Sequence, residues 1–174
     1  GLFPSGSYIT NNLTTTTIDL IVTNAGGGIK WNGLVDANWQ NGGPANWLTL
    51  ADSNATVFTL LDSVLFDDTA LANFTVNVAE VVSPGSILVN NTNQNYVFGG
   101  AGLISGNGTL TKSGPGALAL ASANGFTGGT VLNAGTLKLS STGALGAAGR
   151  VLTLNGGTLQ LANDASVAAY SNAI

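Results

Sequence analysis

The chain has no cysteine, histidine or methionine, and charged side chains make up only 7% of its 174 residues. Without Cys or His there is no thiol nucleophile, no imidazole base, no disulfide framework and no zinc site of the usual kind. Four scattered basic residues at a net charge of −4 cannot form the basic stripe that nucleic acid binding needs. No apolar run approaches the ~20 residues of a membrane-spanning helix. We therefore expect no nucleic acid partner, no cofactor and no membrane-spanning segment.

What the chain does contain is small and uncharged: 25 glycines, many Asn and Thr, and 44% hydrophobic residues. That apolar content is too high for a charge-solvated disordered chain, and the length suits one domain or two small ones. Because the chain begins at Gly1 rather than Met, we expect a processed or excised product whose export signal is gone. The composition predicts a secreted or surface-exposed bacterial protein.

Apolar and polar residues alternate in short runs, which favours β-strands over helices. Leucines occupy one face of each run, and Thr, Lys, Gln or Ala occupy the other. The clearest runs are 108–111, 117–120, 135–139, 151–154 and 157–161. Gly and Asn clusters separate them and predict tight turns, because both residues tolerate positive φ.

The strands also repeat. The tripeptide Gly-Thr-Leu begins at Gly108, Gly135 and Gly157, which are 27 and then 22 residues apart. A repeat of 20–30 residues with several short strands is typical of a β-solenoid, in which each coil buries its leucines only by stacking on the next. We expect the stacked core to contain Leu110, Leu118, Leu120, Leu137, Leu139, Leu152, Leu154, Leu159 and Leu161.

Residues 108–161 resemble the autotransporter-associated β-strand repeat. The matching pieces are Gly-Thr-Leu-Thr-Lys-Ser-Gly (108–114), Leu-Ala-Leu (118–120), Asn-Gly-Phe-Thr-Gly-Gly-Thr (124–130) and Asn-Ala-Gly-Thr-Leu (133–137). The resemblance implies an all-β, right-handed parallel β-helix in a secreted or surface-displayed bacterial protein. The chain is short for that family.

Three regions follow from this organisation. Residues 1–25 form an N-terminal strand segment behind a glycine joint, which a neighbouring subunit could receive as a donated strand. Residues 29–100 contain the tryptophans and resemble the stretch that precedes the repeats in the same family, so we expect the first coils or a cap. Residues 101–174 are expected to hold the β-helix repeats.

Two groups of side chains are candidate sites. Trp31, Trp39 and Trp47 recur every eight residues; they either form a stacking platform for surface glycans or pack against the solenoid, and packing is favoured. Asp67 and Asp68 are adjacent carboxylates that could ligate calcium or act in a glycosidase. No second carboxylate group is spaced to join them, so a solvated turn is the favoured interpretation.

The first functional hypothesis is a structural subunit that self-assembles head to tail into an extracellular filament or surface layer. Open solenoid ends expose unpaired backbone groups, and a low charge opposes association little. The alternative is a stalk fragment of an adhesin or autotransporter passenger, with the tryptophans as its glycan-binding surface. A carbohydrate-active enzyme on a β-helix is the least favoured hypothesis, because no constellation of carboxylates is evident.

Overall fold

The computed structural model describes residues 7–12, 17–22 and 28–161, and every regular element in these ranges is a β-strand. The described residues contain no helix with the length and apolar character needed to cross a bilayer. Their strands form four sheets, of which two are large. We call the eight-stranded sheet sheet I, the six-stranded sheet sheet II, and the small parallel sheet of β9 and β12 sheet III.

Both large sheets run from late strands of the chain at one edge to early strands at the other. Sheet I contains β17 (Leu152–Leu154), β15 (Thr130–Leu132), β13 (Thr109–Ser113), β10 (Ser86–Asn90), β7 (Ser63–Asp67), β3 (Gly28–Trp31), β5 (Trp47–Thr49) and β6 (Ala55–Thr56). Sheet II contains β18 (Thr158–Leu161), β16 (Thr136–Leu139), β14 (Ala117–Leu120), β11 (Tyr96–Gly99), β8 (Thr75–Val78) and β4 (Asn38–Trp39). Sheet III pairs β12 (Leu103–Ile104) with β9 (Val81–Val82), and the fourth sheet pairs β1 (Ser7–Asn12) with β2 (Thr17–Val22).

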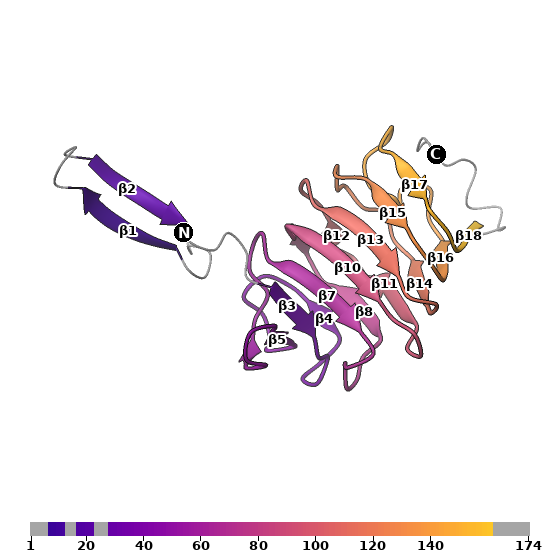
Figure 1. Cartoon of the computed structure of the whole chain (residues 1–174), viewed down its shortest axis with the longest axis horizontal. Coiled ribbons are helices and arrows are strands. Elements are labelled where there is room, and N and C mark those ends of the chain that lie inside the picture. The colour runs from indigo at the N-terminus through magenta and orange to yellow at the C-terminus, as the bar shows by residue number, and fades with distance from the viewer. Residues whose placement is uncertain (1–6, 13–16, 23–27, 162–174) are drawn as a thin grey trace.

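From β7 onward each coil contributes one strand to sheet I and one to sheet II, and the two coils that begin at β7 and β10 also contribute β9 and β12 to sheet III. Ser63, Ser86 and Thr109 are successive register partners in sheet I, which sets a step of 23 residues between these coils. All of the sheet II strands pair in parallel. Figure 1 shows the resulting stack, running from β3 and β4 to β17 and β18. The all-β parallel β-helix predicted from the sequence is confirmed.

The core lies between sheets I and II, because alternate residues of each strand point inward. In sheet II, Val76, Phe98, Leu120 and Leu139 are successive register partners, and each is at most 2% exposed. The alternation that predicted the strands therefore also places their apolar faces in one continuous column. Stacking buries what a single coil would leave in water.

An antiparallel hairpin covers the first coil. Strand β5 pairs antiparallel with β3, and β6 pairs antiparallel with β5, so sheet I ends in this hairpin at its β3 end. The hairpin carries Trp47 and leads to Phe58, both of which are fully buried against the first coil. Their rings fill the end of the core column, which closes this end of the stack to water.

The N-terminal segment is a hairpin within the described residues. Strand β1 pairs antiparallel with β2, in a register that runs from Ser7 opposite Val22 to Asn12 opposite Thr17. Within the described part of the chain, these two strands pair only with each other. The other residues of the predicted 1–25 segment lie outside the described residues, and donation of a strand to a neighbour stays a prediction.

The three Gly-Thr-Leu tripeptides do not mark equivalent points of the coil. The first leads into β13 of sheet I, where Leu110 pairs with Ile87, whereas the other two lead into β16 and β18 of sheet II. The 22-residue offset is therefore a true coil step, since Leu137 pairs with Leu159. The 27-residue offset is not a coil step. The tripeptide marks the place where a strand begins after a corner, and strands of both sheets begin in this way.

Two register-paired leucines test the stacking directly. Leu139 is fully buried, and its partner Leu161, on the last described strand, is 51% exposed. We expect Leu139→Ala to lower the free energy of unfolding by about 3 kcal/mol, because it leaves a cavity between coils. We expect Leu161→Ala to cost less than about 1 kcal/mol. Urea denaturation of the two variants measures both values, and equal losses would contradict the assigned column.

Candidate functional site

The predicted leucine core is divided between the inward faces of sheets I and II. In sheet II, Leu118 and Leu137 are stacked with Leu159, and Leu120 and Leu139 with Leu161. In sheet I, the column of Leu110 and Leu152 also contains Thr130, which lies between them. Leu110, Leu118, Leu120, Leu137, Leu139 and Leu152 are buried.

The remaining predicted core leucines lie on the last described coil. Leu159 is partly buried and packs against the core, whereas Leu154 is 45% and Leu161 51% exposed. Within the described residues, no strand pairs with the outer edges of β17 and β18. The sequence pattern placed Leu154 and Leu161 on the correct, inward face. A residue on that face is buried only when a further coil covers it.

The tryptophans lie inside the molecule. Trp31, Trp39 and Trp47 are at most 1% exposed, and the Trp47 ring meets the other two edge-on, at centroid distances of 5.0 and 5.5 Å. Phe66 packs against all three rings. Trp31 also donates from its indole nitrogen to the carbonyl of Asn73 at 3.1 Å. No ring face is open to a sugar in this structure, so the tryptophans fill the core beneath the hairpin.

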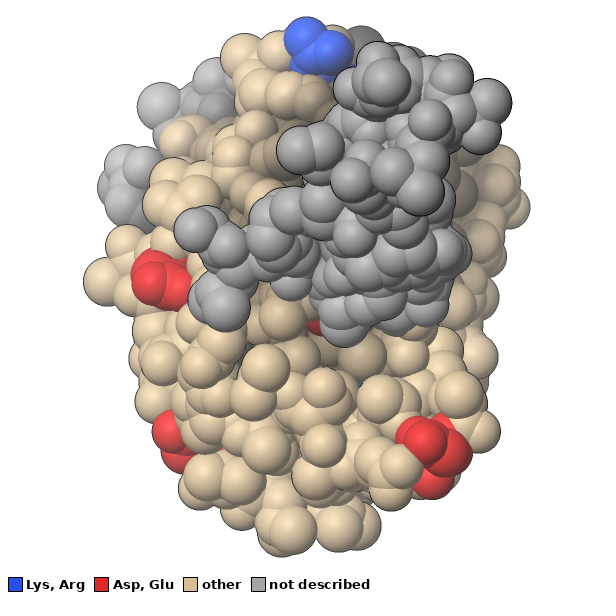
Figure 2. All heavy atoms as spheres, turned by 90° about the vertical axis from the view of Figure 1, so that its left-hand side faces the viewer, with Lys and Arg blue, Asp and Glu red and all other residues tan. Residues whose placement is uncertain are grey.

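Asp67 and Asp68 hold turns of the backbone. The carboxylate of Asp68 accepts hydrogen bonds from the backbone amides of residues 92–94, at 2.8 to 3.0 Å, across to the next coil. These bonds lower the pKa of Asp68, and the bond from the Gln94 amide has the largest effect. Asp67 accepts from the amide and hydroxyl of Thr69. On the face in Figure 2 the acidic residues lie well apart, and no three potential metal ligands cluster among the described residues.

The Asn-Gly-Phe-Thr-Gly-Gly-Thr stretch forms a corner that joins three coils. The side chain of Asn124 accepts a hydrogen bond from the amide of Ile104 at 3.1 Å, and donates to the carbonyl of Ala144 at 2.8 Å. Ile104 belongs to the preceding coil and Ala144 to the following one. Because an amide side chain carries both a donor and an acceptor, Asn suits this bridging position.

The rest of the corner brings two backbones into close contact. Phe126 is buried in the core, and Thr127 bonds through both its amide and its hydroxyl to the carbonyl of Gly106. A Cβ on Gly128 would lie 2.5 Å from the carbonyl oxygens of Asn107 and Gly108. Only glycine therefore fits where this corner rests on the coil below it.

Asparagine side chains also stack along the corner that follows sheet I. Asn155 donates to the side-chain oxygen of Asn133 at 2.8 Å, and Asn133 donates to the hydroxyl of Ser113 at 3.2 Å. In the earlier coil, Asn91 is fully buried and donates to the carbonyls of Gln94 and Ala117. These ladders run in the stacking direction and fix the register between coils.

Lys112 is a buried charged residue that the sequence analysis did not assign to the core. Its side chain is fully buried, and its register partners are Val89 and Leu132, both core residues. The Nζ atom donates to the carbonyl oxygens of Ser113 at 2.7 Å, Gly114 at 2.8 Å and Ala134 at 3.4 Å. The signal was present in the alternation, because Lys112 shares the inward face with Leu110. The run predicted for this strand ended at residue 111, so it did not include Lys112.

The Lys112 ammonium group is a clamp on the corner between two coils. Ser113 and Gly114 follow it on its own coil, and Ala134 lies on the next. A Cβ on Gly135, whose φ is +73°, would approach Nζ to 2.8 Å, so the corner leaves room for the cation only with glycine there. Burial lowers the pKa of Lys112 to about 8, while the carbonyl partners favour the protonated form. The clamp is therefore charged at neutral pH.

Lys112→Met tests this clamp. At pH 7 we expect the variant to lose about 2 kcal/mol of unfolding free energy, because three carbonyls lose their donor in a dry site. The pKa of about 8 in the folded chain lies below the ~10.4 of an unfolded lysine. Between those values the unfolded chain binds more protons, so the wild-type stability should rise relative to the variant between pH 8 and 9.5.

Urea denaturation at a series of pH values measures the difference between the two proteins. Lys138→Met is the matched control, because Lys138 is an exposed lysine of sheet II. The same rise in both differences would mean that burial of Lys112 is not its cause. A Lys112 difference that stays constant from pH 7 to 9.5 would mean that the ammonium is not buried.

Comparisons with known proteins match the repeat described above. A family model for the passenger-associated-transport-repeat matches residues 110–139. The adhesin BmaC autotransporter of Brucella suis biovar 1 is 42% identical over 57 residues, which cover 33% of this chain and 2% of that protein. This chain thus spans a small part of the length of the relative, and no solved structure matches it. The match covers the segment that contains Lys112 and Asn124, and it supports the resemblance of this chain to the autotransporter-associated repeat family.

Proposed function

We propose that this chain is a stalk segment of a surface-displayed autotransporter passenger, in which stacked coils hold an adhesive part of the protein away from the cell. The observation that carries the proposal is the unbroken parallel register of sheets I and II, from β7 and β8 to β17 and β18. The transport-repeat match and the adhesin name of the relative support it. The same comparison supports a secreted or cell-surface location.

The physical basis of the stalk is that its bonds run along its length. In a parallel stack the backbone hydrogen bonds point from coil to coil, and the side-chain bonds of Asn124 and Lys112 cross the same boundaries. Bending the rod would have to break several such bonds together with the packed core column. A rod of this kind gains length by adding coils, without a new type of contact.

The acidic residues support a structural role rather than catalysis. Asp36, Asp68 and Glu80 each accept hydrogen bonds from backbone amides of turns. A glycosidase needs two carboxylates that face each other across a substrate. In this chain the described carboxylates hold separate loops, so we propose a non-enzymatic role for this segment.

The hairpin of β5 and β6 favours a stalk over a head-to-tail polymer. Filament formation by coil stacking needs an open edge at each end of the subunit. At the β3 end, sheet I instead ends in short antiparallel strands above a buried aromatic cluster. A second subunit that stacked directly on β3 would have to displace this hairpin, and with it Trp47 and Phe58, which would expose large apolar surfaces.

Purified chain tests the stalk against the filament. We expect a monomer by light scattering after size-exclusion chromatography, and short single rods in negative-stain micrographs at all concentrations. Residues 1–23 offer a matched control, since deleting them removes any donated strand and should leave the monomer unchanged. Uniform fibres of the full chain would contradict the stalk proposal and favour the filament.

A further inference from the structure

A groove opens on the outside of sheet I, between the coils of β15 and β17. It has a volume of about 210 Å³, and its lining includes Thr127, Val131, Gly149, Arg150, Val151 and Thr153. Val131 and Thr153 are register partners on the outer face of the two strands. The amide of Thr130 donates to the carbonyl of Val151 at 3.0 Å, which holds the two walls together. The groove is thus framed by paired backbone.

The lining combines an apolar surface with hydroxyl groups, and a sugar ring can bind to both. Val151 is 56% exposed, and with Val131 it offers an apolar surface for the CH face of a ring. The exposed Thr127 donates its hydroxyl to the carbonyl of Gly106, so the lone pairs of its oxygen remain available to a ligand hydroxyl. Thr153 is an exposed hydroxyl on the opposite wall.

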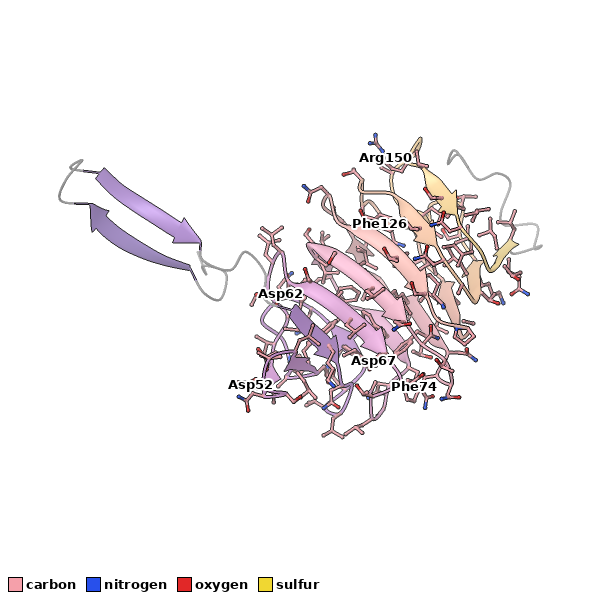
Figure 3. The ribbon with its side chains drawn as sticks, in the orientation of Figure 1. Asp52, Asp62, Asp67, Phe74, Phe126 and Arg150 are labelled. Carbon is pink, nitrogen blue, oxygen red and sulfur yellow. The ribbon has the colours of Figure 1, made fainter. Side chains whose placement is uncertain are left out.

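Arg150 places a positive charge at the groove. It is the only arginine in a chain of net charge −4, it is exposed, and the described residues that line the groove include no Asp or Glu. Figure 3 places Arg150 at the β17 end of the stack, away from the labelled Asp52, Asp62 and Asp67 near β3, β5 and β7. A guanidinium group recognises carboxylates with two parallel hydrogen bonds. The groove is therefore suited to an anion that also carries hydroxyls.

We propose that this groove binds one acidic sugar residue, a sialic acid or a hexuronate, with its carboxylate on Arg150 and its ring against Val131 and Val151. The volume is below the ~300–1,000 Å³ of pockets for drug-sized ligands, so a single ring is the unit bound. The inference goes beyond the stalk role and does not depend on it. It places the glycan contact at the exposed Arg150, whereas the sequence analysis had considered the tryptophans, which are buried.

Amide chemical shifts of the isotope-labelled full chain test the proposal. The ligands are the methyl glycosides of N-acetylneuraminic acid, glucuronic acid and galactose, with sodium acetate as a simple carboxylate. We expect saturable shifts at residues 127–131 and 149–153, with a dissociation constant in the millimolar range, for one or both acidic sugars. Arg150→Gln should weaken this binding about tenfold or more.

Lys138→Gln removes the same charge from an exposed site in sheet II, and it should leave the affinity unchanged. Thermal unfolding of both variants checks that neither substitution has altered the fold. The acidic sugar that binds more tightly shows whether the ligand is a sialic acid or a hexuronate. The proposal is overturned if neither acidic sugar shifts these amides, if galactose or acetate does so equally well, or if Arg150→Gln binds as the wild type does.

Discussion

Each coil of this protein is incomplete without the next, and the parallel backbone ladder between coils is the interaction on which the structure depends. A coil on its own exposes a row of unpaired amides and carbonyls on both edges, together with half of its core. Pairing in exact register satisfies both at once, since the same step that aligns Leu120 with Leu139 also aligns their backbone groups. A shift of one residue would turn every inward side chain outward.

The corners determine whether strands of successive coils can pair. Each corner must let the chain turn while two backbones lie close together, and at the transport repeat this is achieved by three devices. Gly128 leaves space for the backbone below it, Asn124 bonds to the coils on both sides, and the Lys112 ammonium group gathers carbonyls of two coils. A buried cation without a carboxylate partner is costly in most cores. At this corner three carbonyl oxygens take the place of the water molecules that would otherwise solvate the ammonium group.

The sequence contained enough to predict the stack but not every position in it. Period-two alternation placed the leucines on the correct face, and Asn124 to Thr130 lie at a corner as their Gly and Asn content indicated. Alternation alone could not show that Leu110 and Leu137 belong to different sheets, because both are the last residue of a Gly-Thr-Leu tripeptide at the start of a strand. The run that predicted this strand ended at residue 111 and left out Lys112, which continues the same inward face. The hairpin over Trp39 depends on contacts between distant segments, which local pattern does not report.

Engineered disulfides test the stacked register most directly, because the chain has no cysteine of its own. Ala119 and Lys138 are outward-facing register partners on β14 and β16, so cysteines at these two positions should oxidise to a disulfide within the monomer. The matched control pairs Ala117→Cys with Lys138→Cys, which are two residues out of register and too far apart for a bond without strain. The account is supported if only the first pair crosslinks, as seen by non-reducing electrophoresis and mass spectrometry. It is contradicted if the in-register pair stays reduced or if the control pair crosslinks equally well.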